Sequence, residues 1–253
     1  MIFLGYIAAA ILGAIFGSYA TLFAYRIPKQ ESCFGRYFGP KSRCPHCNTV
    51  IRTRELIPII NWLFTRGKCV SCNAKIPKTF LFIELATSIL FIICYNKFSF
   101  SEDFIIFSLL SVSLVIAIAI DYHNKFIPNE ILTTILILGI VQRVLVDNSI
   151  IPAILSAALG IVLSALFYKV FYKNGNGFLK DQRQAFSYAK FIIVASVCFS
   201  SNLFLLYFLA VLSIFTVIII LGKSLKRDNF SLGFSLLMPF IWLLICPPFD
   251  NLF

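Results

Sequence analysis

Two pairs of cysteines are the residues of this 253-residue sequence whose type and spacing most directly indicate chemistry. Cys44 and Cys47 form one Cys-x-x-Cys pair, Cys69 and Cys72 form another, and 21 residues separate the pairs. Each turn brings two thiolates to one point, so that two turns can close a tetrahedron around a structural Zn²⁺. The alternative is unrelated thiols or disulfides. His46, inside the first pair, is interpreted as a bystander that can substitute for a ligand.

Two acidic residues lie within or at the end of apolar stretches. Asp121 ends an apolar run and is followed by Pro128, where the next apolar run begins. A carboxyl at the mouth of a helix bundle can do acid–base work; the alternative is an ordinary helix-terminal aspartate. Glu84 lies inside another apolar run, where a carboxyl is costly and is functional or paired, in this case with Lys75 or Lys78.

The elements that position these residues are predicted to be membrane helices. The sequence is 59% hydrophobic and only 13% charged, with a mean hydropathy of +0.89. These values exclude an ordinary soluble enzyme and a disordered chain. We expect an all-α integral membrane protein with about eight transmembrane helices and a small cytosolic zinc-ribbon-like insert after the first. The predicted helices cover residues 1–25, 80–96, 103–120, 127–146, 150–172, 186–200, 203–222 and 231–246.

Basic residues indicate how the helices are oriented. The net charge is +11, and basic residues crowd the C-terminal side of the first apolar run. The N-terminus is therefore predicted to lie outside and residues 26–79 inside. If Lys169 and Lys190 snorkel from helix ends, only Lys97 and Arg143 fall outside. This asymmetry explains the positive charge without nucleic acid. The predicted domains are a first helix at 1–25, a cytosolic four-Cys domain at 26–79 and a membrane helix bundle at 80–253.

Several short motifs follow one another along the chain. They are Gly17-Ser18 with Arg26-Ile27-Pro28, Ser42 to Cys47, Glu55 to Leu63, Gly67 to Cys72, Glu84, and Ile120-Asp121 with Pro128. In this order they resemble the patterns of the bacterial type IV prepilin peptidases, which are GS…RxP, SRCPxC, ENIPxxSWL, GxCxxC, a glutamate, and ID…P around a first catalytic aspartate.

The resemblance implies an integral-membrane aspartic endopeptidase of the bacterial inner membrane, with its four-Cys domain and active site on the cytosolic side. Such enzymes remove the basic leader from type IV prepilins and from pseudopilins of type II secretion. Many then methylate the new N-terminus with S-adenosylmethionine. The implied partners are these precursor proteins and the lipid bilayer, and the implied cofactors are structural zinc and, where methylation is retained, S-adenosylmethionine.

The second aspartate of the family, in a G-x-G-D-x-K motif, is missing from its expected place. One alignment puts Phe178 at its position, and the alignment that we prefer puts Tyr188 there. Aspartic proteolysis needs two close carboxyls that share a proton. A tyrosine, with a reference pKa of about 10, is a poor base at neutral pH. The nearest carboxyl is Asp181, which we predict as the catalytic partner of Asp121; the alternative is a simple loop charge.

Two main functions follow. The first is an active leader peptidase that uses Asp121 and Asp181, with N-methylation as a further activity. The alternative is a degenerate member that binds leaders, or only methylates, without proteolysis. A transporter with an intramembrane acid fits the composition but gives no reason for the cysteines.

Overall fold

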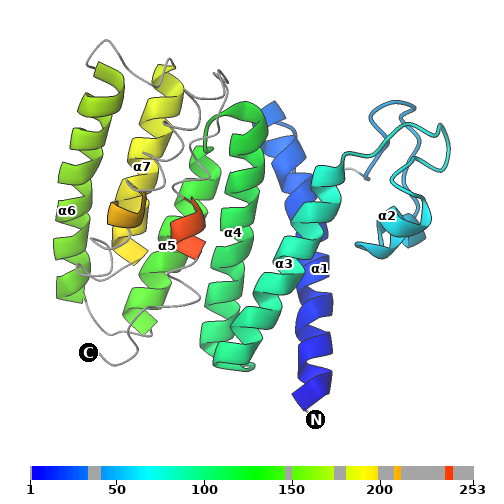
Figure 1. Cartoon of the computed structure of the whole chain (residues 1–253), viewed down its shortest axis with the longest axis horizontal. Coiled ribbons are helices and arrows are strands. Elements are labelled where there is room, and N and C mark those ends of the chain that lie inside the picture. The colour runs from blue at the N-terminus through cyan, green and yellow to red at the C-terminus, as the bar shows by residue number, and fades with distance from the viewer. Residues whose placement is uncertain are drawn as a thin grey trace. The chain divides into compact units, whose positions relative to one another are not determined.

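The computed structural model describes residues 2–33, 41–145, 150–173, 181–198, 208–211 and 237–241, and these residues are mostly helical (Figure 1). They contain no β-strand, only the isolated bridges Arg43–Val50 and Lys68–Lys75. The long helices are α1 (Ile2–Arg26), α3 (Lys78–Phe98), α4 (Glu102–Asn124), α5 (Asn129–Leu145), α6 (Ile150–Tyr168) and α7 (Gln182–Cys198). The short ones are η1 (Ile27–Lys29), η2 (Thr53–Leu56), α2 (Ile60–Phe64) and the π-helical turn η3 (Lys169–Lys173).

Among the residues that the structure describes, three helices are long and apolar enough to cross a bilayer. The candidate spans are Phe3–Lys29, Lys78–Phe98 and Glu102–Asn124. The described residues therefore confirm a largely helical protein with candidate membrane spans. The predicted count of eight helices stays a prediction, because 203–222 and 231–246 are described only at 208–211 and 237–241, where they are helical.

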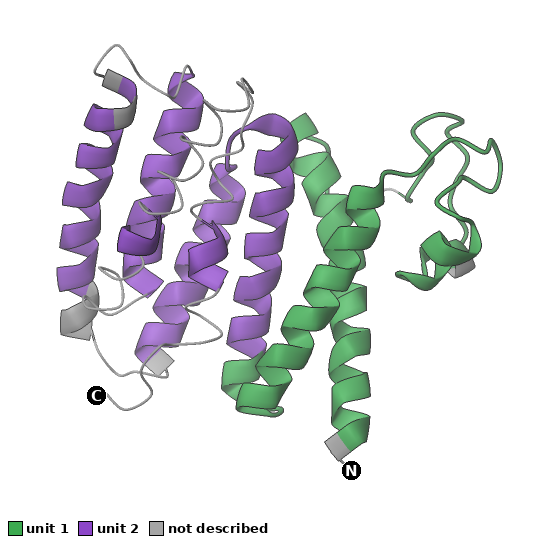
Figure 2. Cartoon of the chain, viewed as in Figure 1, with its two compact units in different colours: residues 1–104 green, residues 105–253 purple. Residues whose placement is uncertain are grey.

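The chain divides into two compact units, residues 1–104 and 105–253 (Figure 2). The boundary falls near the start of α4, so the first unit contains α1, the cysteine-containing segment and α3. The domains predicted from the sequence divide the chain after residues 25 and 79 into a first helix, a four-Cys domain and a helix bundle. The two units are defined by packing instead, so that division stays a prediction.

In the first unit, α1 and α3 lie side by side because α1 presents glycines to α3 (Figure 1). A Cβ atom built on Gly13 would lie 2.6 Å from the Cα of Ser88, and one on Gly17 would lie 2.8 Å from the Cα of Glu84. The two glycines are four residues apart and so share one helix face, which is the small-residue pattern of close helix pairs in membranes. This contact fixes the second turn of α3 against α1.

In the second unit, α7 packs against both α5 and α6 (Figure 1). Its inner face buries Tyr188, Phe191 and Ile192 completely. At the other end of α7, the guanidinium of Arg143 on α5 donates from Nε to the carbonyl of Val197 at 3.3 Å. A cation at the C-terminus of a helix is favourable because the last carbonyls have no partners within the helix. These contacts fix the rotation of α7, which carries one of the residues of the candidate active site.

Candidate active site and candidate metal centre

Asp121 lies in the last turn of α4 and is fully buried. Its backbone carbonyl accepts a hydrogen bond from the N–H of Lys125 at 2.9 Å. Lys125 has φ +61°, a left-handed conformation that ends the helix. The next residues, Ile127 and Pro128, are buried before α5 begins at Asn129. The sequence thus places a carboxylate at the end of an apolar helix, as predicted, and the fold removes it from solvent.

The side chain that meets Asp121 is Tyr188 of α7. Its hydroxyl donates a hydrogen bond to Oδ1 of Asp121 at 2.5 Å, and both residues are fully buried. Gln184, one turn earlier on α7, donates from Nε2 to the Tyr188 hydroxyl oxygen at 3.1 Å. The amide of Gln184 thereby orients the phenol toward the carboxylate. The contact agrees with the preferred alignment, in which Tyr188 stands where the family has its second aspartate.

Asp181 precedes α7 and is exposed. Its Oδ1 accepts the backbone N–H of Arg183 at 2.9 Å, and its carbonyl accepts the N–H of Ala185 at 3.1 Å. This is the bonding of a helix N-cap, a common role for aspartate. Asp181 precedes Tyr188 by seven residues, which corresponds to about 10 Å along the helix axis. Its contacts in this structure are with the start of its own helix, and its catalytic role stays a prediction.

Lys190 belongs to the same preferred alignment. Its Nζ donates to Oδ1 of Asn129, the first residue of α5, at 2.9 Å, and lies 4.5 Å from the centre of the Phe186 ring. Lys190 therefore joins α7 to the start of α5 two residues after Tyr188. The competing alignment through Phe178 falls outside the described residues.

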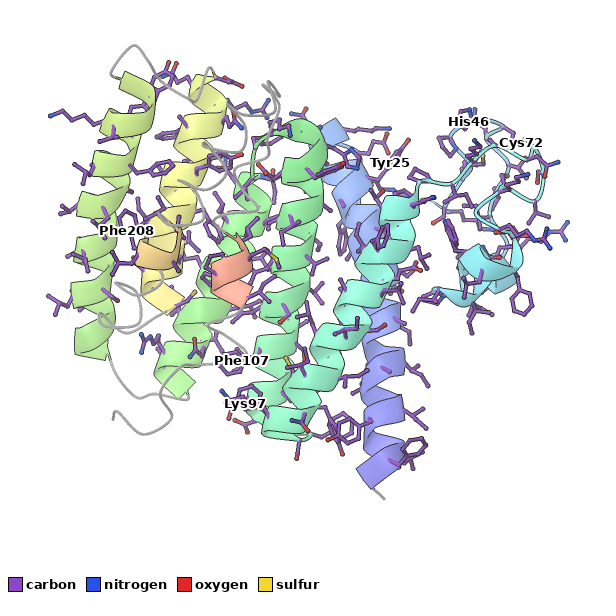
Figure 3. The ribbon with its side chains drawn as sticks, viewed as in Figure 1. Tyr25, His46, Cys72, Lys97, Phe107 and Phe208 are labelled. Carbon is purple, nitrogen blue, oxygen red and sulfur yellow. The ribbon has the colours of Figure 1, made fainter. Side chains whose placement is uncertain are left out.

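The four cysteines predicted as metal ligands converge. The Sγ atoms of Cys44, Cys47, Cys69 and Cys72 all lie within 4.8 Å of one another, and those of Cys44 and Cys72 are 3.8 Å apart. Zn–S bonds of about 2.3 Å in a tetrahedron require sulfur atoms about 3.8 Å apart. The cluster therefore fits a tetrahedral metal ion. His46 is exposed in this region, where Figure 3 labels it near Cys72.

Both cysteine turns have the same backbone hydrogen bonds. The N–H of the first cysteine donates to the carbonyl five residues on, and its carbonyl accepts the N–H of the asparagine that follows the second cysteine. That asparagine has positive φ in each turn, a conformation that asparagine tolerates better than most residues. The bonds are Cys44 N to Thr49 O (3.1 Å), Asn48 N to Cys44 O (2.9 Å), Cys69 N to Ala74 O (2.9 Å) and Asn73 N to Cys69 O (2.9 Å).

Local hydrogen bonds lower the pKa of two of the four thiols. Those between Cys47 and Thr49 lower the pKa of the Cys47 thiol to about 6. Backbone N–H groups within its own turn lower the pKa of the Cys69 thiol. For Cys72, the hydrogen bond from Ala74 acts in the same direction, but desolvation of the thiol and its hydrogen bonds with the neighbouring thiols outweigh it and raise the pKa to about 12. Ligation by all four cysteines as thiolates would bring four negative charges together, which a bound cation would offset.

Glu84 is a third site residue that the sequence singled out. It is buried on α3, and its Oε2 accepts the backbone N–H of Ile59 at 2.7 Å. Its partner in the described residues is thus a backbone group and not Lys75 or Lys78. No sequence pattern indicates this pairing, because the two residues are 25 positions apart.

Comparison with known proteins supports the resemblance seen in the motifs. Residues 11–98 match the family model described as the bacterial Peptidase A24 N-terminal domain. The chain is similar to proteins named prepilin leader peptidase/N-methyltransferase. That of Bacillus subtilis (strain 168) is 37% identical over 123 residues, covering 48% of each chain. That of Dichelobacter nodosus is 31% identical over 175 residues, covering 68% of this chain and 57% of the relative.

A further relative of the same name, from Stutzerimonas stutzeri, is 30% identical over 154 residues and 53% of each chain. The match thus spans about half the length of these relatives. No solved structure matches the chain. The resemblance to the prepilin leader peptidase/N-methyltransferase family is confirmed. The family-model match contains the four cysteines and Glu84, whereas Asp121 and Tyr188 lie beyond it.

Sequence reasoning missed Gln184, Asn48 and Asn73. A signal for the asparagines was present, because each pair reads Cys-x-x-Cys-Asn. Gln184 could have been found from its position, since it precedes Tyr188 by four residues and so lies on the same face of α7.

Proposed function

We propose that this protein is a membrane-embedded prepilin peptidase homologue that binds type IV prepilin or pseudopilin precursors at the cytosolic face of the inner membrane without cleaving them. The observation that carries the proposal is the hydrogen bond from Tyr188 to Asp121. In the preferred alignment, this phenol stands where the family resemblance implies a second carboxyl.

The chemical reason lies in the proton that an aspartic dyad shares. One carboxylate must take a proton from water while a neutral carboxyl donates to the substrate carbonyl. Tyr188 can donate, and Gln184 holds it in the orientation to do so. A phenol is nevertheless a poor base for the second half of the cycle at neutral pH. The buried Asp121–Tyr188 pair therefore retains polar groups that can recognise a backbone carbonyl or amide, but it lacks the pair that activates water.

Proteolysis by Asp121 with Asp181 is the second candidate. Two observations favour it: relatives are named leader peptidases, and Asp181 is an exposed carboxylate at the start of the helix that carries Tyr188. In this version, Asp181 must leave its N-cap position and approach Asp121. N-methylation with S-adenosylmethionine belongs to the same candidate, since the relatives' names include it.

The four-Cys cluster is proposed to hold a structural Zn²⁺ in the cytosol. Four sulfur ligands favour zinc or an iron–sulfur centre, and the closed tetrahedral spacing leaves no position for substrate. When bound, the ion would supply folding free energy to a segment with little core of its own. Cys44, Cys47, Cys69 and Cys72 would be its ligands.

Co-expression with a prepilin from the same genome tests these candidates. Leader removal is followed by the mass of the prepilin, and binding by co-purification after crosslinking. The proposal expects crosslinked prepilin of full mass, under conditions in which a control peptidase processes the same substrate. Leader removal by the unaltered protein that is lost in both Asp121→Asn and Asp181→Asn would instead establish the second candidate.

A further inference from the structure

The cysteine-containing segment has an apolar surface of its own, centred on α2. Within residues 56–64, five large apolar side chains are exposed, and Phe64 is the most exposed at 84%. Two of the others precede Phe64 within α2, and two precede the helix. They are Leu56, Ile57, Ile60, Leu63 and Phe64. We call residues 56–64 the apolar loop.

A contact with α3 sets the position of the apolar loop along the axis of that helix. Ile59, at its centre, donates its backbone N–H to Glu84. Glu84 lies six residues after Lys78, the first residue of a candidate membrane span. Six residues correspond to about 9 Å of helix. The loop is therefore attached to α3 about one and a half turns inside the span, and Figure 1 shows α2 level with the N-terminal half of α3.

The backbone at this contact is strained. Ile59 has φ +61° and ψ −55°, and the N–H of Ile60 donates to the carbonyl of Pro58 at 2.5 Å. This is a γ-turn with positive φ, which is rare and costly for a β-branched residue. Such a conformation persists only where the surroundings hold it, and the carboxylate of Glu84 provides one such constraint. The turn is thus a fixed point of the loop.

The sequence around the apolar loop is strongly basic. Between residues 41 and 79 the sequence has eight basic residues and a single acidic one. Arg52 precedes the loop, Arg66 and Lys68 follow it, and all three are exposed. Trp62 packs against Gly67, where a Cβ would lie 2.6 Å from the indole ring. Exposed apolar residues with an aromatic residue and flanking cations are typical of segments that lie in a bilayer interface.

We propose that the apolar loop is an interfacial anchor, inserted between the headgroups and acyl chains of a leaflet that contains anionic lipid. Arg52, Arg66 and Lys68 bind the anionic headgroups, and Phe64 with Leu63 enters the acyl region. The attachment to Glu84 places the anchor at this depth. The four-Cys domain is thereby held against the membrane at two points, through its covalent link to α3 and through the loop. The inference does not depend on whether the chain cleaves its partner.

Tryptophan quenching in vesicles tests the anchor. The full chain carries Trp62→Phe and Trp242→Phe, and Phe64→Trp introduces the probe. The vesicles contain phosphatidylglycerol and phosphatidylcholine brominated along the acyl chains. His46→Trp in the same background is the matched control, because His46 is exposed in a cysteine turn that Figure 3 draws well away from α2. Retained zinc reports that each variant is folded.

We expect brominated lipid to quench the Phe64→Trp probe at least about threefold more than the His46→Trp probe, and aqueous acrylamide to show the reverse order. Adding Leu63→Asp should remove most of the lipid quenching. Val70→Asp, at an apolar residue of the second cysteine turn that is 63% exposed, should leave it unchanged.

Three results would overturn the proposal. The first is acrylamide quenching of the Phe64→Trp probe equal to that of the control in a zinc-loaded chain. The second is shielding of the probe that grows with protein concentration, which would assign the loop to a second copy. The third is shielding that requires added prepilin, which would assign it to the substrate.

Discussion

The hydroxyl of Tyr188 donates to Oδ1 of Asp121 across 67 residues of sequence, and both side chains are fully buried. The pair joins the end of α4 to the first half of α7. Because Gln184 fixes the phenol from the other side, the two helices meet through an ordered row of polar groups. Replacement of one carboxyl of a dyad by a phenol leaves the geometry of a donor facing an acceptor, but it changes what the pair can do with a proton.

We predict that Tyr188→Asp creates or raises leader cleavage. The shorter side chain restores a second carboxyl beside Asp121, and two close carboxyls can share one proton. The change is measured as processed prepilin by mass, and we expect at least about a tenfold rise over the unaltered chain. Tyr188→Asn is the control, because asparagine has the size of aspartate but no carboxyl group. Equal processing by the two variants would contradict the prediction.

Tyr188→Phe should lower stability by about 1–3 kcal/mol, since it removes a donor from a buried carboxylate. Thermal unfolding in nanodiscs measures the loss. Tyr122→Phe is the matched control, because Tyr122 follows Asp121 but is 62% exposed. We expect its unfolding temperature to stay near that of the unaltered chain. A similar decrease in both variants would mean that the Tyr188 bond contributes little.

Metal removal should release about one zinc ion per chain and make residues 41–79 sensitive to protease. Cys72→Ser should have the same effect without a chelator. Cys33→Ser should retain the ion, because Cys33 contacts the carbonyl of Glu31 rather than the cluster. Zinc content by mass spectrometry and tryptic cleavage after Arg66 are the measurements. An unchanged digestion pattern in the metal-free chain would count against a structural role.

Gly17→Leu should separate α1 from α3 and lower stability by about 1–3 kcal/mol, since the backbone of Glu84 occupies the space that the new side chain needs. Ile15→Phe, at a position of α1 that is 42% exposed, is the control. Unfolding temperature and the lipid quenching of the Phe64→Trp probe report the change together. If Gly17→Leu behaves like the control, the close approach of the two helices does not require glycine.

The sequence was most informative where a pattern is local. The first predicted helix, 1–25, matches α1 within one residue at its C-terminal end, and the cysteine spacing predicted the cluster at Cys44 and Cys72. Apolar runs and Cys-x-x-Cys turns depend only on residues that are close in sequence, so the sequence alone predicts them. Asp121 was found in the same way, as an acid at the end of such a run.

Long-range contacts explain what the sequence could not predict. The alignment suggested Tyr188 as the replacement for an aspartate, but its bond to Asp121 depends on how α4 and α7 pack. The attachment of Ile59 to Glu84 depends on a turn with positive φ at an isoleucine, which residue preferences disfavour. Asp181 was predicted from its proximity in sequence, whereas the backbone of α7 uses it as an N-cap.

The repeated bonding of the two cysteine turns means that the candidate metal centre is built from two locally closed units. Each turn closes through its own hydrogen bonds, Cys44 with Thr49 and Cys69 with Ala74. Each turn would therefore present its two sulfur atoms as one bidentate unit, and loss of the ligands of one turn would leave the backbone hydrogen bonds of the other turn in place.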